Sequence, residues 1–269
     1  MADSGTPYSR RYSHAMRVTV LGKSPSWPDA GGACSGYLVQ DEQTTALVDC
    51  GSGVFAKLRG VCNYAAVDVV VISHMHADHF IDLVPFACAL TYGPRHGTGR
   101  PRLLLPAGGA DALQMLARGG GHDDLMDGAF AVSEYDPADS VAANSLTIRF
   151  SPVPHFIATY AIEVSSTEGG GRFTFGSDHR LTDALDTFAA DTDLLLLEAT
   201  LPAPESESES SHGHMTAAEA GKVAARCNAR RLVLTHISDE SDSDRALAEA
   251  QGTFPGAVEV AREGAVYDV

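Results

Sequence analysis

A dense group of metal-ligating residue types follows directly on a strongly apolar run in this sequence. Residues 74–79 read His-Met-His-Ala-Asp-His, so three histidines and one aspartate fall within six positions. The preceding run, residues 67–72, reads Val-Asp-Val-Val-Val-Ile, which predicts a strand buried in a sheet. A chance polar loop rarely has this composition immediately after such a strand. We therefore expect the fold to place a metal site at the end of this strand.

The spacing within this motif predicts two metal ions. In an extended loop the side chains at positions i and i+2 point the same way, so His74 and His76 can bind one ion together. Asp78 and His79 lie where the chain turns into the next expected helix, and they can reach a second ion roughly 3.5–4 Å from the first. Imidazole and carboxylate donors suit zinc, with manganese or iron as alternatives.

Further ligands must come from elsewhere, because six residues cannot fill two coordination spheres. His155, Asp178 and His236 each stand at the end of a predicted strand, where functional residues are commonly placed. A single histidine such as His155, taken by itself, is more often structural than catalytic. Three strand-end candidates together with the dense motif are nevertheless typical of a catalytic metal site.

The rest of the chain alternates short strands and helices, which favours a layered α+β or α/β fold in one domain. Strands are expected over residues 17–22, 36–40, 45–49, 67–72, 102–105, 129–135, 145–150, 159–164, 172–175, 194–198 and 231–235. Helices are expected over residues 54–59, 80–91, 110–118, 182–190, 216–227 and 242–251. Thr216 and Glu219 fit a capping box at the start of one of these helices.

Two segments are expected to lie outside the packed core. Residues 1–15 lack periodicity and predict a disordered N-terminal extension, which leaves residues 16–269 as the domain. The Glu- and Ser-rich stretch of residues 202–211 predicts a solvated loop. Because it leads into His212 and His214, a flap over the site is the alternative interpretation.

The charge balance argues against a nucleic-acid partner. Lys and Arg total 19 against 35 Asp and Glu, and the resulting net charge of −16 repels a phosphate backbone.

No apolar stretch is long enough to cross a bilayer, and residues 1–16 lack the apolar segment of a secretory signal. Five cysteines, an odd number without a C-x-x-C pair, favour reduced thiols. The sequence therefore predicts a cytoplasmic protein that does not associate with membranes.

Taken in order along the chain, these motifs resemble those of the metallo-β-lactamase superfamily. The resemblance extends over essentially the whole chain and rests on residues 48–51 (Val-Asp-Cys-Gly), residues 74–79, His155, Asp178 and His236. It implies an α/β fold of the αββα sandwich type, in which two mixed β-sheets are flanked by helices. The metals of this family lie at one edge of the sandwich, between the sheets.

The resemblance also implies a role for each residue. The residues implied to bind metal form two sets that share one carboxylate: His74, His76 and His155 for one ion, Asp78, His79 and His236 for the other, and Asp178 between them. Asp49 would orient the site from behind the ligands. The sequence departs from the family pattern directly after Asp178, where His179 stands in place of the usual threonine. His179 is expected either to line the site or to face solvent.

Two further features narrow the branch of the superfamily. Asp178 stands where true β-lactamases have cysteine or serine, which argues against antibiotic hydrolysis. Residues 213–221 (Gly-His-Met-Thr-Ala-Ala-Glu-Ala-Gly) resemble a segment of the phosphodiesterase branch, which includes the tRNA-processing ribonuclease Z. This resemblance implies that His214 lies by the scissile phosphate and protonates the leaving oxygen, the alternative being a histidine of a flexible loop.

Ribonuclease Z carries a long basic arm between the positions of His155 and Asp178. Here only 23 residues separate the two, and no basic cluster lies between them. Together with the negative net charge, this argues against tRNA or duplex nucleic acid as a substrate.

The expected function is that of a dinuclear metal-dependent hydrolase acting on small phosphodiesters, such as cyclic nucleotides or other cyclic phosphates, through hydroxide generated at the metals. His214, Asp178 and Asp78 are the expected catalytic residues. The main alternative is hydrolysis of esters, thioesters or lactones with the same metals. A metal-binding sensor without turnover and an iron-based redox role are the others. The expected partner is a small anionic substrate, and homodimers are common in the family.

Overall fold

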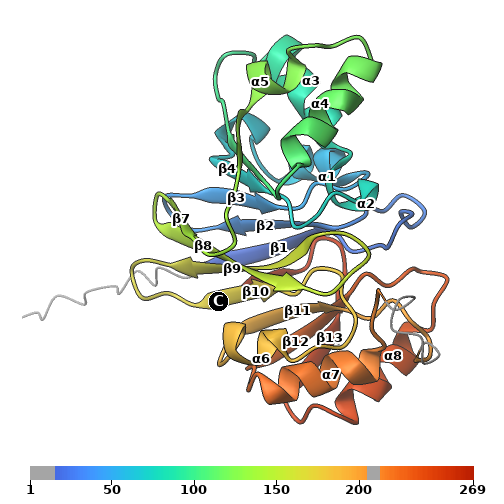
Figure 1. The fold of residues 1–269 in the computed structure, drawn as a ribbon. Helices are drawn as coiled ribbons and strands as arrows, with labels where there is room; N and C mark the ends of the chain where they lie inside the picture. Colours follow the sequence, from blue (N-terminus) through green and yellow to red (C-terminus); the bar gives the residue numbers. More distant parts are fainter. Residues whose placement is uncertain (1–15, 205–212) are drawn as a thin grey trace, which may run out of the picture.

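Two seven-stranded sheets packed face to face form the centre of the molecule, with helices on both outer faces (Figure 1). This computed structural model describes residues 16–204 and 213–269. The extension expected over residues 1–15, and most of the loop expected over residues 202–211, lie outside the described residues. The layered arrangement confirms the predicted fold class.

The first sheet has the strand order β14-β1-β2-β3-β4-β5-β6. Its strands are β1 (Arg17–Gly22), β2 (Gly36–Gln40), β3 (Thr45–Val48), β4 (Val69–Val71), β5 (Arg102–Leu105), β6 (Ala131–Glu134) and β14 (Val266–Asp268). Pairing is antiparallel from β14 to β3 and parallel from β3 to β6. The sheet is therefore mixed, as expected.

The second sheet repeats this plan with the order β13-β12-β11-β10-β9-β8-β7. Its strands are β7 (Ser140–Ala143), β8 (Leu146–Val153), β9 (Thr159–Ser166), β10 (Arg172–Phe175), β11 (Leu194–Glu198), β12 (Arg231–Thr235) and β13 (Ala257–Val260). Pairing is antiparallel from β7 to β10 and parallel from β10 to β13. The molecule thus consists of two similar halves.

Each half carries its own layer of helices (Figure 1). The first half has α1 (Val54–Val61), the 3-10 helix η1 (Tyr64–Ala66), α2 (Ala77–Phe80), α3 (Leu83–Tyr92), α4 (Gly109–Gly119) and α5 (Leu125–Ala129). The second half has α6 (Ala184–Phe188), α7 (Ala217–Arg226) and α8 (Ser243–Gln251). Among the described residues, no helix is long and apolar enough to cross a membrane.

The central strands are buried on both faces, and β4 shows why they read as continuous apolar runs. Val70 packs among the helices of the first half, whereas Val69 and Val71 pack between the two sheets. Neither face of such a strand requires polar residues. The apolar run before the histidine motif therefore reflects a strand at the centre of the sandwich.

The prediction of a single helix over residues 80–91 is wrong. The chain forms two helices, because α2 ends at Phe80 and α3 begins at Leu83. Between them Asp82 accepts a hydrogen bond from the backbone N–H of Phe55 at 2.9 Å, which fixes the bend. Pro85 lies in the first turn of α3, where a missing N–H costs little.

Several smaller differences concern segments near the sheet edges. The strand expected from residue 129 begins at Ala131, because α5 continues to Ala129. The short strands β7, β13 and β14 were not expected from the sequence pattern. The capping box of Thr216 and Glu219 is confirmed, and all five cysteines carry free thiols.

Candidate metal centre

The predicted ligands converge because the strands that precede them end at one edge of the sandwich. In the second sheet β8, β10, β11 and β12 run in the same direction, since β9 is antiparallel to both β8 and β10 and the other pairs are parallel. Their C-terminal ends lead to His155, Asp178, Glu198 and His236. In the first sheet, β4 leads to the motif of residues 74–79. Both halves therefore contribute side chains to one place.

His74, His76 and His155 form a first group of donors. Each offers a ring nitrogen, and these atoms lie within 4.8 Å of one another. Nδ1 of His76 is 3.1 Å from Nε2 of His74 and 3.1 Å from Nε2 of His155. Burial lowers the pKa of all three rings, that of His155 to about 4, so they are neutral near pH 7. Neutral imidazole is the form that binds a metal ion.

Hydrogen bonds fix the orientation of these rings. His155 donates its Nδ1–H to the carbonyl of Gly213 at 2.6 Å, so its Nε2 carries the lone pair. Nδ1 of His74 lies 3.1 Å from the hydroxyl oxygen of Ser73 and 3.3 Å from that of Ser177. In both rings the Nε2 atom is thereby directed into the group.

Asp78, His79, Asp178 and His236 form a second group, which is almost completely buried. Oδ2 of Asp178 is 3.3 Å from Nε2 of His79 and 3.3 Å from Nε2 of His236. Nε2 of His79 is buried and makes no hydrogen bond with the described residues. Such an atom costs free energy unless it finds a partner, and a cation among these donors would supply one. The group therefore fits a divalent metal ion.

Asp178 lies between the two groups. Besides its contacts in the second group, its Oδ2 is 4.0 Å from Nε2 of His74 in the first. Burial opposes the ionised form of Asp178, but His236 and His79 hold its pKa well below the usual value. Burial likewise opposes the charge of Asp78, but a hydrogen bond with His236 and the nearby imidazole of His79 lower its pKa. Both carboxylates are therefore ionised at neutral pH.

Asp49 supports the second group from behind. Its Oδ2 accepts a hydrogen bond from Nδ1 of His79 at 2.7 Å, and its Oδ1 accepts one from the backbone N–H of Ser73 at 2.7 Å. The first bond turns Nε2 of His79 toward the other donors. Asp49, Ser177 and His236 have positive φ angles of 59°, 61° and 58°. Strained backbone of this kind clusters at functional sites.

Glu198 is a buried carboxylate that the sequence analysis missed. Its Oε1 accepts hydrogen bonds from Nδ1 of His214 at 2.9 Å and from the backbone N–H of His179 at 2.8 Å. Its Oε2 accepts one from the hydroxyl of Thr200 at 2.6 Å. Glu198 ends the apolar strand β11, so the same strand-end pattern that identifies the ligands could have identified it.

His214 lies beside both groups of donors. Its ring centroid is 5.0 Å from that of His155 and 5.6 Å from that of His236. It lies two residues before Thr216, the N-cap of α7, which fixes the backbone close to it. The structure therefore brings His214, as well as the seven expected ligands, to one site.

Of the two placements expected for His179, exposure to solvent is wrong. Its side chain is fully buried, so it does not face solvent, and it belongs to neither group of donors. It donates its Nδ1–H to the carbonyl of Arg180 at 2.9 Å, and its Nε2 packs against Gly176. The turn after β10 directs Asp178 into the site, and the side chain of His179 packs back against the same turn.

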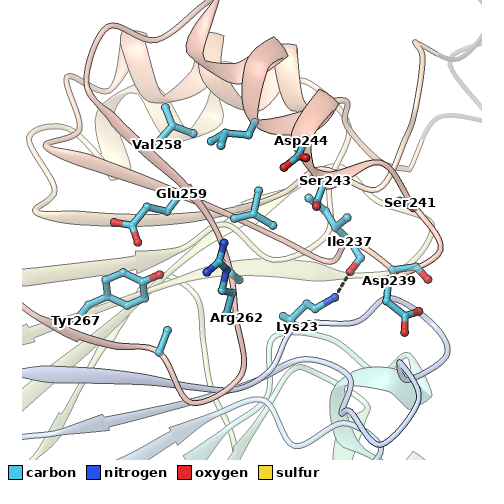
Figure 2. A pocket seen from close by; sticks show the side chains of 15 residues that line it. Lys23, Ile237, Asp239, Ser241, Ser243, Asp244, Val258, Glu259, Arg262 and Tyr267 are labelled. Carbon is cyan, nitrogen blue, oxygen red and sulfur yellow. Dashed lines mark hydrogen bonds between the residues drawn. The ribbon is translucent and has the colours of Figure 1, made fainter.

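A separate cavity of about 500 Å³ lies beside the loop that follows His236 (Figure 2). Here Nζ of Lys23, at the end of β1, donates a hydrogen bond to the carbonyl of Ile237 at 2.7 Å. The backbone N–H of Asp239 donates to Oδ1 of Asp29 at 2.9 Å. These bonds attach the loop after His236 to the first half of the molecule. The cavity thus adjoins the loop that follows His236, and none of the expected ligands lines it.

The fold and the donor groups together define the class of the protein, which is that of metal-dependent hydrolases with the metallo-β-lactamase fold. Residues 44–237 match the family described as "Beta-lactamase superfamily domain", and the chain belongs to this family.

Several relatives match this chain over most of its length and of their own. "Probable metallo-hydrolase YhfI" of Bacillus subtilis is 33% identical over 253 residues, which cover 94% of this chain and 100% of the relative. "Uncharacterized protein Rv1339" of Mycobacterium tuberculosis is 31% identical over 247 residues, covering 91% and 89%. "Ribonuclease Z" of Myxococcus xanthus is 28% identical over 301 residues, covering 93% and 96%.

Solved structures show the same fold. The crystal structure of YhfI from Bacillus subtilis has a TM-score of 0.84 at 30% identity, and covers 95% of this chain and 100% of the other. That of the short form of human tRNase Z has a TM-score of 0.74 at 22% identity, covering 93% and 98%. The second similarity concerns the fold alone.

Proposed function

We propose that this protein hydrolyses small phosphodiesters of the cyclic-nucleotide or cyclic-phosphate type with the help of two divalent metal ions. The observation that carries the proposal is the contact between Glu198 and His214 beside the two donor groups. Cleavage of a diester requires a proton for the departing alkoxide. A histidine held by a buried carboxylate is suited to supply it.

The two donor groups would each hold one ion, with Asp178 shared between them. Divalent ions bound there would offset the charge of the substrate phosphate and lower the pKa of water. Zinc is the proposed ion because the donors are imidazole and carboxylate, and manganese or iron are the alternatives.

The residues of the chain then position the reacting groups. Asp178 and Asp78, both ionised, would accept hydrogen bonds from the attacking water and orient it. Because Nδ1 of His214 is engaged with Glu198, Nε2 is the nitrogen that would pass a proton to the leaving oxygen. Glu198 would hold the ring in place and offset the positive charge of its protonated form.

A small substrate suits the chain better than tRNA. The segment between His155 and Asp178 forms only β9, β10 and their short connections, without a basic arm. The alignment with ribonuclease Z of Myxococcus xanthus spans 301 positions, more than the 269 residues of this chain, so that relative contains insertions absent here. The net charge of −16 also disfavours an RNA backbone.

The five free thiols support a cytoplasmic location, where cysteines stay reduced.

The proposal is tested by hydrolysis of bis(p-nitrophenyl) phosphate and of cyclic nucleotides. The protein is loaded with zinc or manganese, its metal content is measured, and wild type is compared with His214→Ala. His96→Ala is the matched control, because His96 is an exposed histidine in the loop after α3. We expect metal-dependent turnover that falls by about 100-fold or more in His214→Ala and is unchanged in the control.

Two results would contradict the proposal. If wild type with two bound ions hydrolyses no diester but opens lactones or thioesters, the substrate class is wrong. If diesters are cleaved equally well by His214→Ala, the mechanistic role of His214 is wrong.

A further inference from the structure

An exposed aromatic side chain stands directly beside the candidate metal centre. Phe156 follows His155 in the loop between β8 and β9, and 54% of its surface is exposed. Its ring centroid is 4.8 Å from that of His155 and 6.0 Å from that of His214. Ile157, the next residue, is also exposed. An apolar surface thus adjoins the first group of donors, on the side of His214.

The ring of Phe156 is held in this position by the backbone of Gly213. A Cβ atom added to Gly213 would lie 2.1 Å from Cε2 of Phe156, so the ring rests where only a glycine allows it. The carbonyl of the same glycine accepts the hydrogen bond from Nδ1 of His155. The hydroxyl of Thr159 donates to the carbonyl of Ile157 at 2.9 Å and fixes the loop beyond the ring. One side of the ring is therefore packed while the rest stays open.

We infer that Phe156 is a specificity-determining residue that stacks on a planar ring of the substrate, such as a nucleobase, next to the phosphodiester. This inference rests on the proposed function and narrows its substrate class. Metal ions held by the donor groups would account for recognition of the phosphate alone, whereas an exposed aromatic face gains free energy only from an apolar or planar partner. A sugar that separates base and phosphate by a few ångströms would bring the base to Phe156 while the phosphate faces the donors.

The test measures binding, so that it does not depend on turnover. Adenosine 5′-phosphate and ribose 5-phosphate, which lacks the base, are titrated calorimetrically into metal-loaded wild type, Phe156→Leu and Phe156→Tyr. Leucine keeps apolar bulk against Gly213 but has no aromatic face, whereas tyrosine keeps the face. Tyr92→Ala is the control, because it removes an even more exposed aromatic residue from the end of α3, outside the site.

We expect wild type to bind adenosine 5′-phosphate about 10-fold or more tightly than ribose 5-phosphate, since stacking of a base on an aromatic side chain commonly contributes this much. Phe156→Leu should lose most of this ratio, whereas Phe156→Tyr and Tyr92→Ala should keep it. Equal affinities in wild type, or an undiminished ratio in Phe156→Leu, would overturn the inference. Because hydrolysis is measured separately, failure of the proposed function and failure of this inference are distinguishable.

Discussion

Nδ1 of His214 donates a hydrogen bond to Oε1 of Glu198 at 2.9 Å, across 16 residues of sequence. The same carboxylate accepts the backbone N–H of Met215 at 3.2 Å, so it holds both the ring and the chain next to it. Glu198 is fully buried. It therefore couples the end of strand β11 to the histidine that we propose as proton donor.

Replacing Glu198 by glutamine should lower kcat for bis(p-nitrophenyl) phosphate by about 10- to 100-fold, because the neutral amide no longer offsets a proton on His214. Glutamine has nearly the same size, so metal content should not change. Glu259→Gln, in the edge strand β13, is the matched control and should have no effect. An unchanged kcat in Glu198→Gln would exclude the proposed role of this carboxylate.

Removal of the metal ions should lower the melting temperature by about 5–10 °C. Binding at 100 times the dissociation constant adds about 2.7 kcal/mol to the free energy of unfolding, and a protein of this size shifts by a few degrees for each kcal/mol. The measurement is thermal unfolding with chelator and after addition of zinc. Asp78→Asn lacks one anionic donor of the second group. When zinc is added back to this variant, its melting temperature should rise by less than that of wild type. An identical recovery would argue against Asp78 as a ligand.

Without metal, acid should destabilise wild type more than His155→Gln. Burial lowers the pKa of folded His155 from 6.5 to about 4, so between these values the unfolded chain binds a proton that the folded protein does not. The free energy of unfolding therefore falls as the pH decreases from 6.5 toward 4. Glutamine cannot titrate, and the variant should lack this part of the fall. Urea unfolding at several pH values measures the difference, and parallel pH profiles would contradict it.

Substitution of Gly51 by alanine should disturb the second group of donors selectively. An added Cβ would lie 1.8 Å from the backbone oxygen of Asp78, and neither backbone can yield without moving that ligand. We expect a loss of about 1–3 kcal/mol in the free energy of unfolding and one bound ion in place of two.

Gly60→Ala is the control for that variant. Gly60 lies within α1, and nothing lies within 4 Å of an added Cβ. This substitution should leave the metal content unchanged and raise stability by about 0.5–1 kcal/mol, because alanine favours the helix. Two ions retained in Gly51→Ala would show that Asp78 tolerates the displacement.

The layered α/β class and the positions of the central strands along the chain could be expected from the sequence, because these strands are buried on both faces and read as apolar runs. The sandwich of two sheets was implied by the resemblance to the family. The break between α2 and α3 could not. Residues 80–91 have helical spacing throughout, and the bend depends on the hydrogen bond between Asp82 and the backbone of Phe55, which lies 27 residues earlier. Three of the four edge strands, β7, β13 and β14, were missed because little of their surface is buried.

By itself, the sequence determined the histidine motif of residues 74–79 and the strand ends at His155, Asp178 and His236, because local periodicity decides where a strand stops and which way its next side chains point. Tertiary structure alone decided that Glu198 meets His214, that His179 is buried, and that Phe156 borders the site. Those contacts join segments brought together by the pairing of β8 to β12 and by a close approach at Gly213. A local sequence pattern cannot predict these contacts, because they depend on which strands become neighbours in the sheet.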